Sequence, residues 1–184
     1  MTDDEQVIAH THKWIVDVVV GCNFCPFAAK ELKKNAVRYQ VERSGDTQTV
    51  LESFIKECIV LDENHSISTT LLILPGQFEN FEDYLDLVAM AEELLEDEDY
   101  EGIYQVASFH PQYLFGGAPA DDPANYTNRS PYPMLHLLRE DAVEEALEKF
   151  PHPERIPENN ISYARAKGLE QMEKLRAACM GIQL

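Results

Sequence analysis

Three β-rich segments separated by two helix-length segments lie between residues 37 and 109, and this alternation constrains the fold more than any other feature. Apolar and polar residues alternate over residues 37–41, as in a half-buried strand. Thr69 to Leu74 is a continuous β-rich run before a Pro-Gly turn, which is typical of a buried central strand. Ile103 to Phe109 supplies a third strand. Because strands joined by helices run in the same direction, we expect a parallel βαβαβ arrangement.

The remaining patterned segments are predicted to be helices. One helix is capped by Asp46 and runs to about Leu61, and another covers Phe81 to Glu98. We expect further helices over residues 3–20, ending at Gly21; over 131–140, with Ser130 as the N-cap; over 141–150; and over 157–180. The β-branched residues 18–20 leave a strand as the alternative for the end of the first of these helices. The predicted fold class is therefore α/β: a single domain over residues 1–184, with a small, mainly parallel sheet of about three strands in βαβαβ order, an additional N-terminal helix and C-terminal helices.

Acidic residues dominate the charge of the chain. There are 33 Asp and Glu residues against 15 Lys and Arg, a net charge of -18, so neither nucleic acid nor an anionic membrane is expected as a partner. No run of about 20 apolar residues is present to span a membrane. The first residues are acidic, unlike the basic start of a signal peptide, and the expected location is the cytoplasm.

The four cysteines are too few and too irregularly spaced for a secreted disulfide framework, which favours free cytosolic thiols. Cys22 and Cys25 have the spacing of a redox pair or of half a zinc site. A zinc site would need a second pair, or His110 and His136 as the remaining ligands, and nothing in the spacing requires this. We therefore expect neither a stoichiometric metal nor a cofactor.

Residues 103–137 contain no Lys and no Glu, although 26% of the chain is charged. Half of the ten prolines lie between Pro111 and Pro133, so this segment is stiffened against disorder. It begins at the carboxyl end of the third predicted strand, where open α/β sheets bind their ligands. The sequence therefore predicts an ordered functional loop at this edge of the sheet.

Cys25, His110 and His136 are the candidate catalytic residues. Cys25 and Pro26 precede a predicted helix, and the backbone N–H groups at a helix start lower the pKa of a thiol. The alternative is that Cys25 acts as a small buried apolar residue. His110 ends the third predicted strand, and His136 lies on the predicted helix 131–140, pointing away from its apolar stripe. Either histidine could act as an acid or base, and His136 could instead simply be exposed.

Arg129 is the only arginine or lysine between Gly102 and Leu138. Beside a predicted helix start and among polar neighbours, it suits a carboxylate or phosphate, so a small anionic molecule is the expected partner. Alternatively, Arg129 neutralises Asp121 or Asp122 and holds the loop in shape. The candidate ligand-binding residues are Asp121, Asp122, Asn125, Tyr126, Thr127, Asn128, Arg129 and Ser130.

Three stretches carry a resemblance to a known family: Gly21, Asn23 and Cys25 to Ala28; Phe109 to Pro111; and Asp121 to Pro133. Through these residues, and over nearly its whole length, the chain resembles the bacterial family catalogued as domain of unknown function 1415. The resemblance marks the same candidate site and implies no particular activity. Cys22 stands where an apolar residue is expected in that family, which argues against a shared mechanism based on a cysteine pair.

Two functional hypotheses follow from these residues. In the first, the protein is an enzyme acting on a small anionic metabolite, with Cys25 as nucleophile or redox thiol, a histidine as acid or base, and Arg129 binding the anion. In the second, the protein is a non-catalytic module whose rigid loop binds a ligand, a metal or another protein. A small α/β fold is compatible with both.

Overall fold

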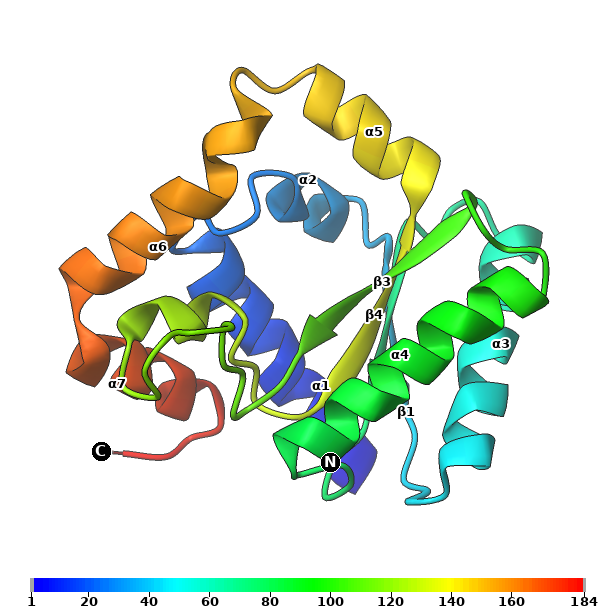
Figure 1. Ribbon diagram of the computed structural model, residues 1–184, viewed down its shortest axis with the longest axis horizontal. Coiled ribbons are helices and arrows are strands. Elements are labelled where there is room, and N and C mark those ends of the chain that lie inside the picture. The colour runs from blue at the N-terminus through cyan, green and yellow to red at the C-terminus, as the bar shows by residue number, and fades with distance from the viewer. Residues whose placement is uncertain (1, 184) are drawn as a thin grey trace.

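The computed structural model describes residues 2–183 and contains a four-stranded sheet in the order β1-β2-β4-β3 (Figure 1). The strands are β1 (Val37–Val41), β2 (Thr69–Ile73), β3 (Tyr104–Phe109) and β4 (Met134–Arg139). β1 and β2 are parallel, whereas β4 is antiparallel to both β2 and β3. The α/β class and the three predicted strands are confirmed. The sheet is mixed, however, so the prediction of a mainly parallel, three-stranded sheet is wrong.

The fourth strand occupies most of the predicted helix 131–140. Leu135 and Leu137 belong to the apolar core on one face of the sheet, whereas Met134 belongs to the core on the other face. This two-residue period is concealed in the sequence because both faces of a central strand are apolar. Ser130 is consequently not a helix cap, and its hydroxyl donates to the Tyr132 carbonyl oxygen at 2.5 Å.

The crossover helices α3 (Thr47–Glu63) and α4 (Phe81–Asp97) cover one face of the sheet (Figure 1). As predicted, Asp46 caps α3, and its carboxylate accepts a hydrogen bond from the Thr49 N–H at 2.8 Å. The core between these helices and the sheet contains Val50, Phe54, Cys58 and Leu61 of α3, Tyr84, Leu87, Val88, Ala91 and Leu95 of α4, and Leu72, Leu135 and Leu137 of the sheet.

A second set of helices lies on the opposite side of the sheet (Figure 1). It comprises α1 (Asp3–Trp14), the π-helical segment η1 (Ile15–Val20), α2 (Ala28–Lys33), α6 (Ile156–Lys167) and α7 (Leu169–Cys179). Trp14 is buried here, and its ring meets the Phe109 ring edge-on with the centroids 5.1 Å apart. The same core includes Val7, Ile15, Val18, Leu71, Ile73, Met134 and Met172.

The C-terminal helix predicted over residues 157–180 is divided in two. Gly168 separates α6 from α7 with a φ of 86°, a left-handed value that favours glycine. The Gly168 N–H donates to the Ala164 carbonyl oxygen at 3.0 Å and so closes α6. The other elements are α5 (Glu140–Glu148) and the 3-10 turns η2 (Pro123–Thr127) and η3 (Pro153–Arg155).

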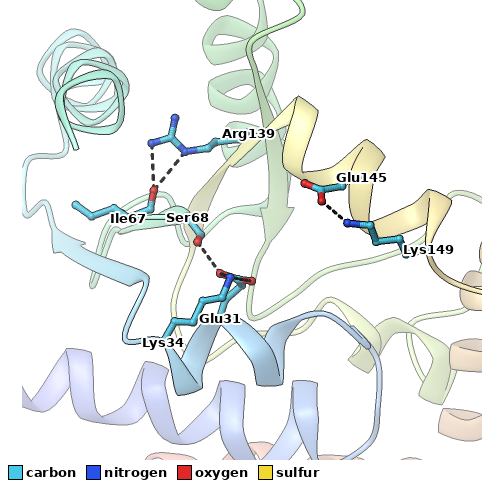
Figure 2. Close-up of polar contacts among 7 residues, drawn as sticks. All are labelled: Glu31, Lys34, Ile67, Ser68, Arg139, Glu145 and Lys149. Atoms are coloured by element: carbon cyan, nitrogen blue, oxygen red, sulfur yellow. Dashed lines mark hydrogen bonds and ion pairs between the residues drawn. The ribbon is translucent and has the colours of Figure 1, made fainter. Parts of the chain in front are cut away.

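The turn before β2 is fixed from both faces of the sheet (Figure 2). Arg139, at the end of β4, donates to the Ile67 carbonyl oxygen at 3.1 Å. From α2, Glu31 accepts a hydrogen bond from the Ser68 hydroxyl at 2.5 Å and pairs with Lys34 at 3.0 Å. Burial alone would raise the pKa of Glu31, but these bonds hold it below its usual value. The start of β2 is therefore tied both to β4 and to α2.

Tyr84 of α4 joins the ends of β3 and β4. Its buried hydroxyl donates to the Met134 carbonyl oxygen at 2.8 Å and accepts from the Phe109 N–H at 3.0 Å. Burial raises the pKa of this phenol well above its usual value, so the hydroxyl keeps its proton. Because Phe109 precedes the loop and Met134 follows it, one hydroxyl fixes both ends of the loop.

We expect Tyr84→Phe to destabilise the fold by about 1 to 3 kcal/mol, because it removes two hydrogen bonds from a buried position. Tyr100→Phe is the matched control, since the Tyr100 hydroxyl bonds the Asp62 carboxylate near the surface, where water can replace the lost bond. Urea denaturation gives both free energies of unfolding. Equal losses in the two variants would contradict the role assigned to Tyr84.

Candidate functional site

The loop between β3 and β4 is held in shape by its own polar side chains. Asn125, in η2, accepts from the Phe115 N–H and donates to the Pro119 carbonyl oxygen, both at 3.0 Å. The Thr127 hydroxyl donates to the Ala124 carbonyl oxygen at 2.9 Å. Both side chains are buried. These two predicted ligand-binding residues therefore use their polar groups within the loop.

His110, the first residue of the loop, is buried and has both ring nitrogens occupied. Nδ1 accepts from the Gln112 N–H at 2.9 Å, so Nε2 carries the proton and donates to the Phe78 carbonyl oxygen at 2.9 Å. The backbone N–H of His110 donates to the Asn128 carbonyl oxygen at 3.2 Å. Burial lowers the pKa of His110 and outweighs the opposing effect of the bond to Phe78. This arrangement supports a loop-positioning role for His110 rather than an acid–base role.

The adjacent carboxylates Asp121 and Asp122 have different surroundings. Asp122 is buried, accepts from the Ala124 N–H at 2.9 Å, and receives two hydrogen bonds from Arg165 of α6 at 3.1 and 2.7 Å. The bonds from Arg165 lower the pKa of Asp122 to about 2. Asp121 is exposed. Within residues 2–183, Arg129 pairs with neither carboxylate, so the alternative that it neutralises one of them is wrong.

Arg129 instead lies against Tyr126, where a second arginine joins it. Arg129 donates to two loop carbonyl oxygens, both at 3.0 Å, and its guanidinium carbon is 4.7 Å from the centroid of the Tyr126 ring. Arg176 of α7 donates to the Pro111 carbonyl oxygen at 2.9 Å, and its guanidinium carbon is 5.7 Å from the same centroid. In the part of the chain that the structure describes, neither arginine forms an ion pair with a carboxylate.

The sequence analysis missed Arg176. Its Nε is buried and has no hydrogen-bond partner among residues 2–183. Burial lowers the pKa of Arg176, and the positive charge of Arg129 acts in the same direction. Arg176 lies four residues after Met172 and three before Cys179, both buried. The sequence did contain a signal for Arg176, because a positively charged residue on the apolar stripe of a predicted helix is unusual.

Cys25 does not cap a helix. α2 begins three residues later, at Ala28, and no side chain caps it, so the predicted position of Cys25 at the start of this helix is wrong. Cys22 is buried and Cys25 partly buried, both as free thiols. No hydrogen bond within the described chain joins Cys25 to His110 or His136. The structure therefore does not join these residues as nucleophile and base.

His136 lies on β4 and not on a helix, and its ring is tilted against that of Phe109 with the centroids 5.7 Å apart. Its Nε2 is 2.8 Å from the Thr69 hydroxyl, which is itself 2.6 Å from the Leu137 carbonyl oxygen. Burial lowers the pKa of His136 to about 4, so the imidazole is neutral at neutral pH. The prediction that His136 lies on a helix is therefore wrong, because residue 136 belongs to a strand.

These features define a mixed-sheet α/β protein with a pair of arginines at the loop between β3 and β4. Residues 6–174 match the family model described as "Protein of unknown function (DUF1415)", and the chain belongs to this family. No curated protein and no solved structure gives a significant match. Among the described residues, no helix combines the length and apolar character needed to cross a membrane, and no group of three or more His, Cys, Asp or Glu side chains could hold a metal ion.

We expect Asp122→Asn to destabilise the protein at neutral pH and to remove part of its sensitivity to acid. The folded-state pKa of Asp122 is depressed to about 2 from an ordinary value of 3.8. The stabilisation from its carboxylate is therefore present above pH 3.8 and is lost as the pH falls from 3.8 towards 2. The asparagine variant lacks this loss, because its side chain does not titrate.

Asp121→Asn is the matched control, since Asp121 is the neighbouring residue and its side chain is exposed. This substitution should leave the dependence of melting temperature on pH as it is in the wild type. Thermal denaturation of the three proteins from neutral to strongly acid pH makes the comparison. If the melting temperature of Asp122→Asn falls with pH in parallel with that of the wild type, the assigned pairing of Asp122 with Arg165 is contradicted.

Proposed function

We propose that the protein binds a small oxyanion, a carboxylate or a phosphate, at Arg129 and Arg176. The observation that carries the proposal is a pair of guanidinium groups at one tyrosine ring without a carboxylate partner, in a chain with a net charge of -18. Among the described residues, Arg38, Arg43 and Arg165 have carboxylate partners, whereas Arg139 and Arg155 do not. Neighbouring positive charges repel each other, so an anion that contacts both stabilises the arrangement.

Both guanidinium groups keep N–H donors for such a ligand. Arg129 uses Nε and Nη2 for loop carbonyl oxygens, and Arg176 uses Nη1. Nη1 of Arg129 and Nη2 of Arg176 make no hydrogen bond among residues 2–183. A planar guanidinium matches the two oxygens of a carboxylate or phosphate. Because the carbonyl bonds already hold both side chains, binding costs little additional side-chain entropy.

The other polar residues of the loop support the site indirectly. Asp122, Asn125 and Thr127 shape the backbone, and Tyr126 holds both arginines through cation–π contacts. This pattern favours a ligand-binding module with a rigid loop over an enzyme in which Cys25 attacks the substrate. The enzyme hypothesis needs a nucleophile beside a base, and no hydrogen bond of the described chain joins Cys25 to a histidine.

We expect Arg176→Lys to weaken oxyanion binding by at least about tenfold, or about 1.4 kcal/mol, because lysine keeps the charge and loses the planar fork. The probes are inorganic phosphate, sulfate, acetate and succinate, each compared with sodium chloride of equal ionic strength. Binding is measured as the rise in melting temperature with anion concentration. Arg155→Lys, the same change at an exposed arginine, should respond as the wild type does.

Arg129→Lys should behave differently from Arg176→Lys. It loses two hydrogen bonds to loop carbonyl oxygens as well as the anion contact, so its melting temperature should fall even without an anion. The proposal fails if none of the four anions stabilises the wild type beyond the chloride control. It also fails if Arg176→Lys keeps the full response.

A further inference from the structure

Two adjoining hollows lie between α3 and α4, which are neighbours over one face of the sheet (Figure 1). The first, of about 410 Å³, lies at the start of both helices, and its lining includes Thr47, Asp83 and Met90. The second, of about 770 Å³, reaches the end of α4, and its lining includes Thr47, Ile55 and Leu94. Because Thr47 lines both hollows, they join into one groove along the two helices, the α3–α4 groove.

Each helix presents a short row of apolar side chains to the α3–α4 groove. Leu51 and Ile55 form the row on α3, and Met90 and Leu94 form the row on α4, with four residues between the members of each pair. Ile59 continues the α3 row and is 45% exposed, while Met90 is 42% exposed. Two neighbouring rows of this kind match the apolar face of a third helix, whose own residues recur at the same spacing.

The rim of the α3–α4 groove is acidic. Among the described residues that line the groove, Lys56 is basic, and five are acidic: Glu52, Glu79, Asp83, Asp86 and Glu98. Further carboxylates on α4 belong to Glu82, Glu92, Glu93, Glu96 and Asp97. None of these acidic side chains forms an ion pair within residues 2–183. The sequence contains no Lys or Arg from residue 57 to residue 128.

These carboxylates are unfavourable for the protein alone. The C-terminal end of a helix carries partial negative charge, so acidic side chains there oppose the helix dipole. The last turn of α4 has no basic residue and ends at Asp97, which Glu98 and Asp99 follow. Neighbouring like charges on a helix also repel one another. A single sign of charge beside an exposed apolar groove therefore favours a partner of the opposite charge.

We propose that the α3–α4 groove binds an amphipathic helix of another protein, with the apolar face of that helix on the two rows and its Lys and Arg residues against the acidic rim. A second copy of this chain does not fit, because it carries the same net charge of -18. The arginine pair belongs to α7 and the loop between β3 and β4, and it contributes no residue to the groove. The two proposals therefore stand independently.

A labelled peptide of leucine and lysine, as long as the 17 residues of α4, tests this by fluorescence anisotropy. Its leucines recur every three or four residues and form one helical face. In one control peptide the same residues are rearranged so that the leucines surround the helix, and in another glutamate replaces lysine. The probe should bind at least about tenfold more tightly than the rearranged peptide, which has the same charge and no apolar face. The glutamate peptide should not bind.

Leu94→Gln places a polar side chain in the α4 row and should weaken binding of the probe by about tenfold. Leu114→Gln, the same change at a leucine of the loop between β3 and β4 that is 40% exposed, should leave the affinity unchanged. Melting temperatures of both variants show whether the fold is kept.

A pair of charge variants tests the acidic rim without touching the apolar rows. Glu52→Gln combined with Glu98→Gln should weaken binding of the probe by about threefold. Glu144→Gln combined with Glu148→Gln removes the same charge from exposed positions on α5 and should have a smaller effect.

The inference is overturned if the probe binds no more tightly than the rearranged peptide, or if each groove variant binds the probe as its control does. Arg176→Lys should keep the full affinity for the probe peptide, so failure of the groove and failure of the oxyanion site are distinguishable.

Discussion

The insertion of β4 between β2 and β3 is the contact on which the rest of the structure depends. An antiparallel strand in that position begins beside the end of β3, and Met134 is indeed the register partner of Phe109. The chain therefore leaves the sheet after Phe109 and returns to the same place. The loop between these residues has neighbouring ends, and the Tyr84 hydroxyl bonds both of them. The same strand places Leu135 and Leu137 in one core and Met134 in the other.

A loop closed in this way explains its unusual composition. Its backbone is folded against itself and against α6 and α7, so many carbonyl and N–H groups need partners within the protein. Asn, Asp and Thr supply such partners at short range, and Pro restricts the chain. Long charged side chains such as Lys and Glu lose more entropy when they are ordered, and the loop contains none. Arg129 suits this loop although it is charged, because its planar guanidinium group donates to loop carbonyl oxygens and stacks on Tyr126.

The arginine pair has more donors than partners. At Arg129 and Arg176 the protein presents more hydrogen-bond donors and positive charge than it pairs within residues 2–183. Buried and half-buried polar groups are normally satisfied, and in the proposed function a bound oxyanion supplies the missing partner.

Local sequence patterns determined β1, β2, β3, the two crossover helices and the Asp46 cap, because each depends on residues close together in the chain. They also located the loop and Arg129. Only the tertiary structure decided that residues 134–139 form a strand, because an apolar run is compatible with a helix until strands lie on both sides of it.

Tertiary structure also decided which residues contact one another within the site. Arg176 reaches Tyr126, and Arg165 reaches Asp122, only because α6 and α7 pack on the loop. The contact between His136 and Thr69 likewise exists only because β2 pairs with β4. Hydrogen bonds and charge contacts between distant residues follow from strand register and helix packing, and a local periodicity carries no information about either.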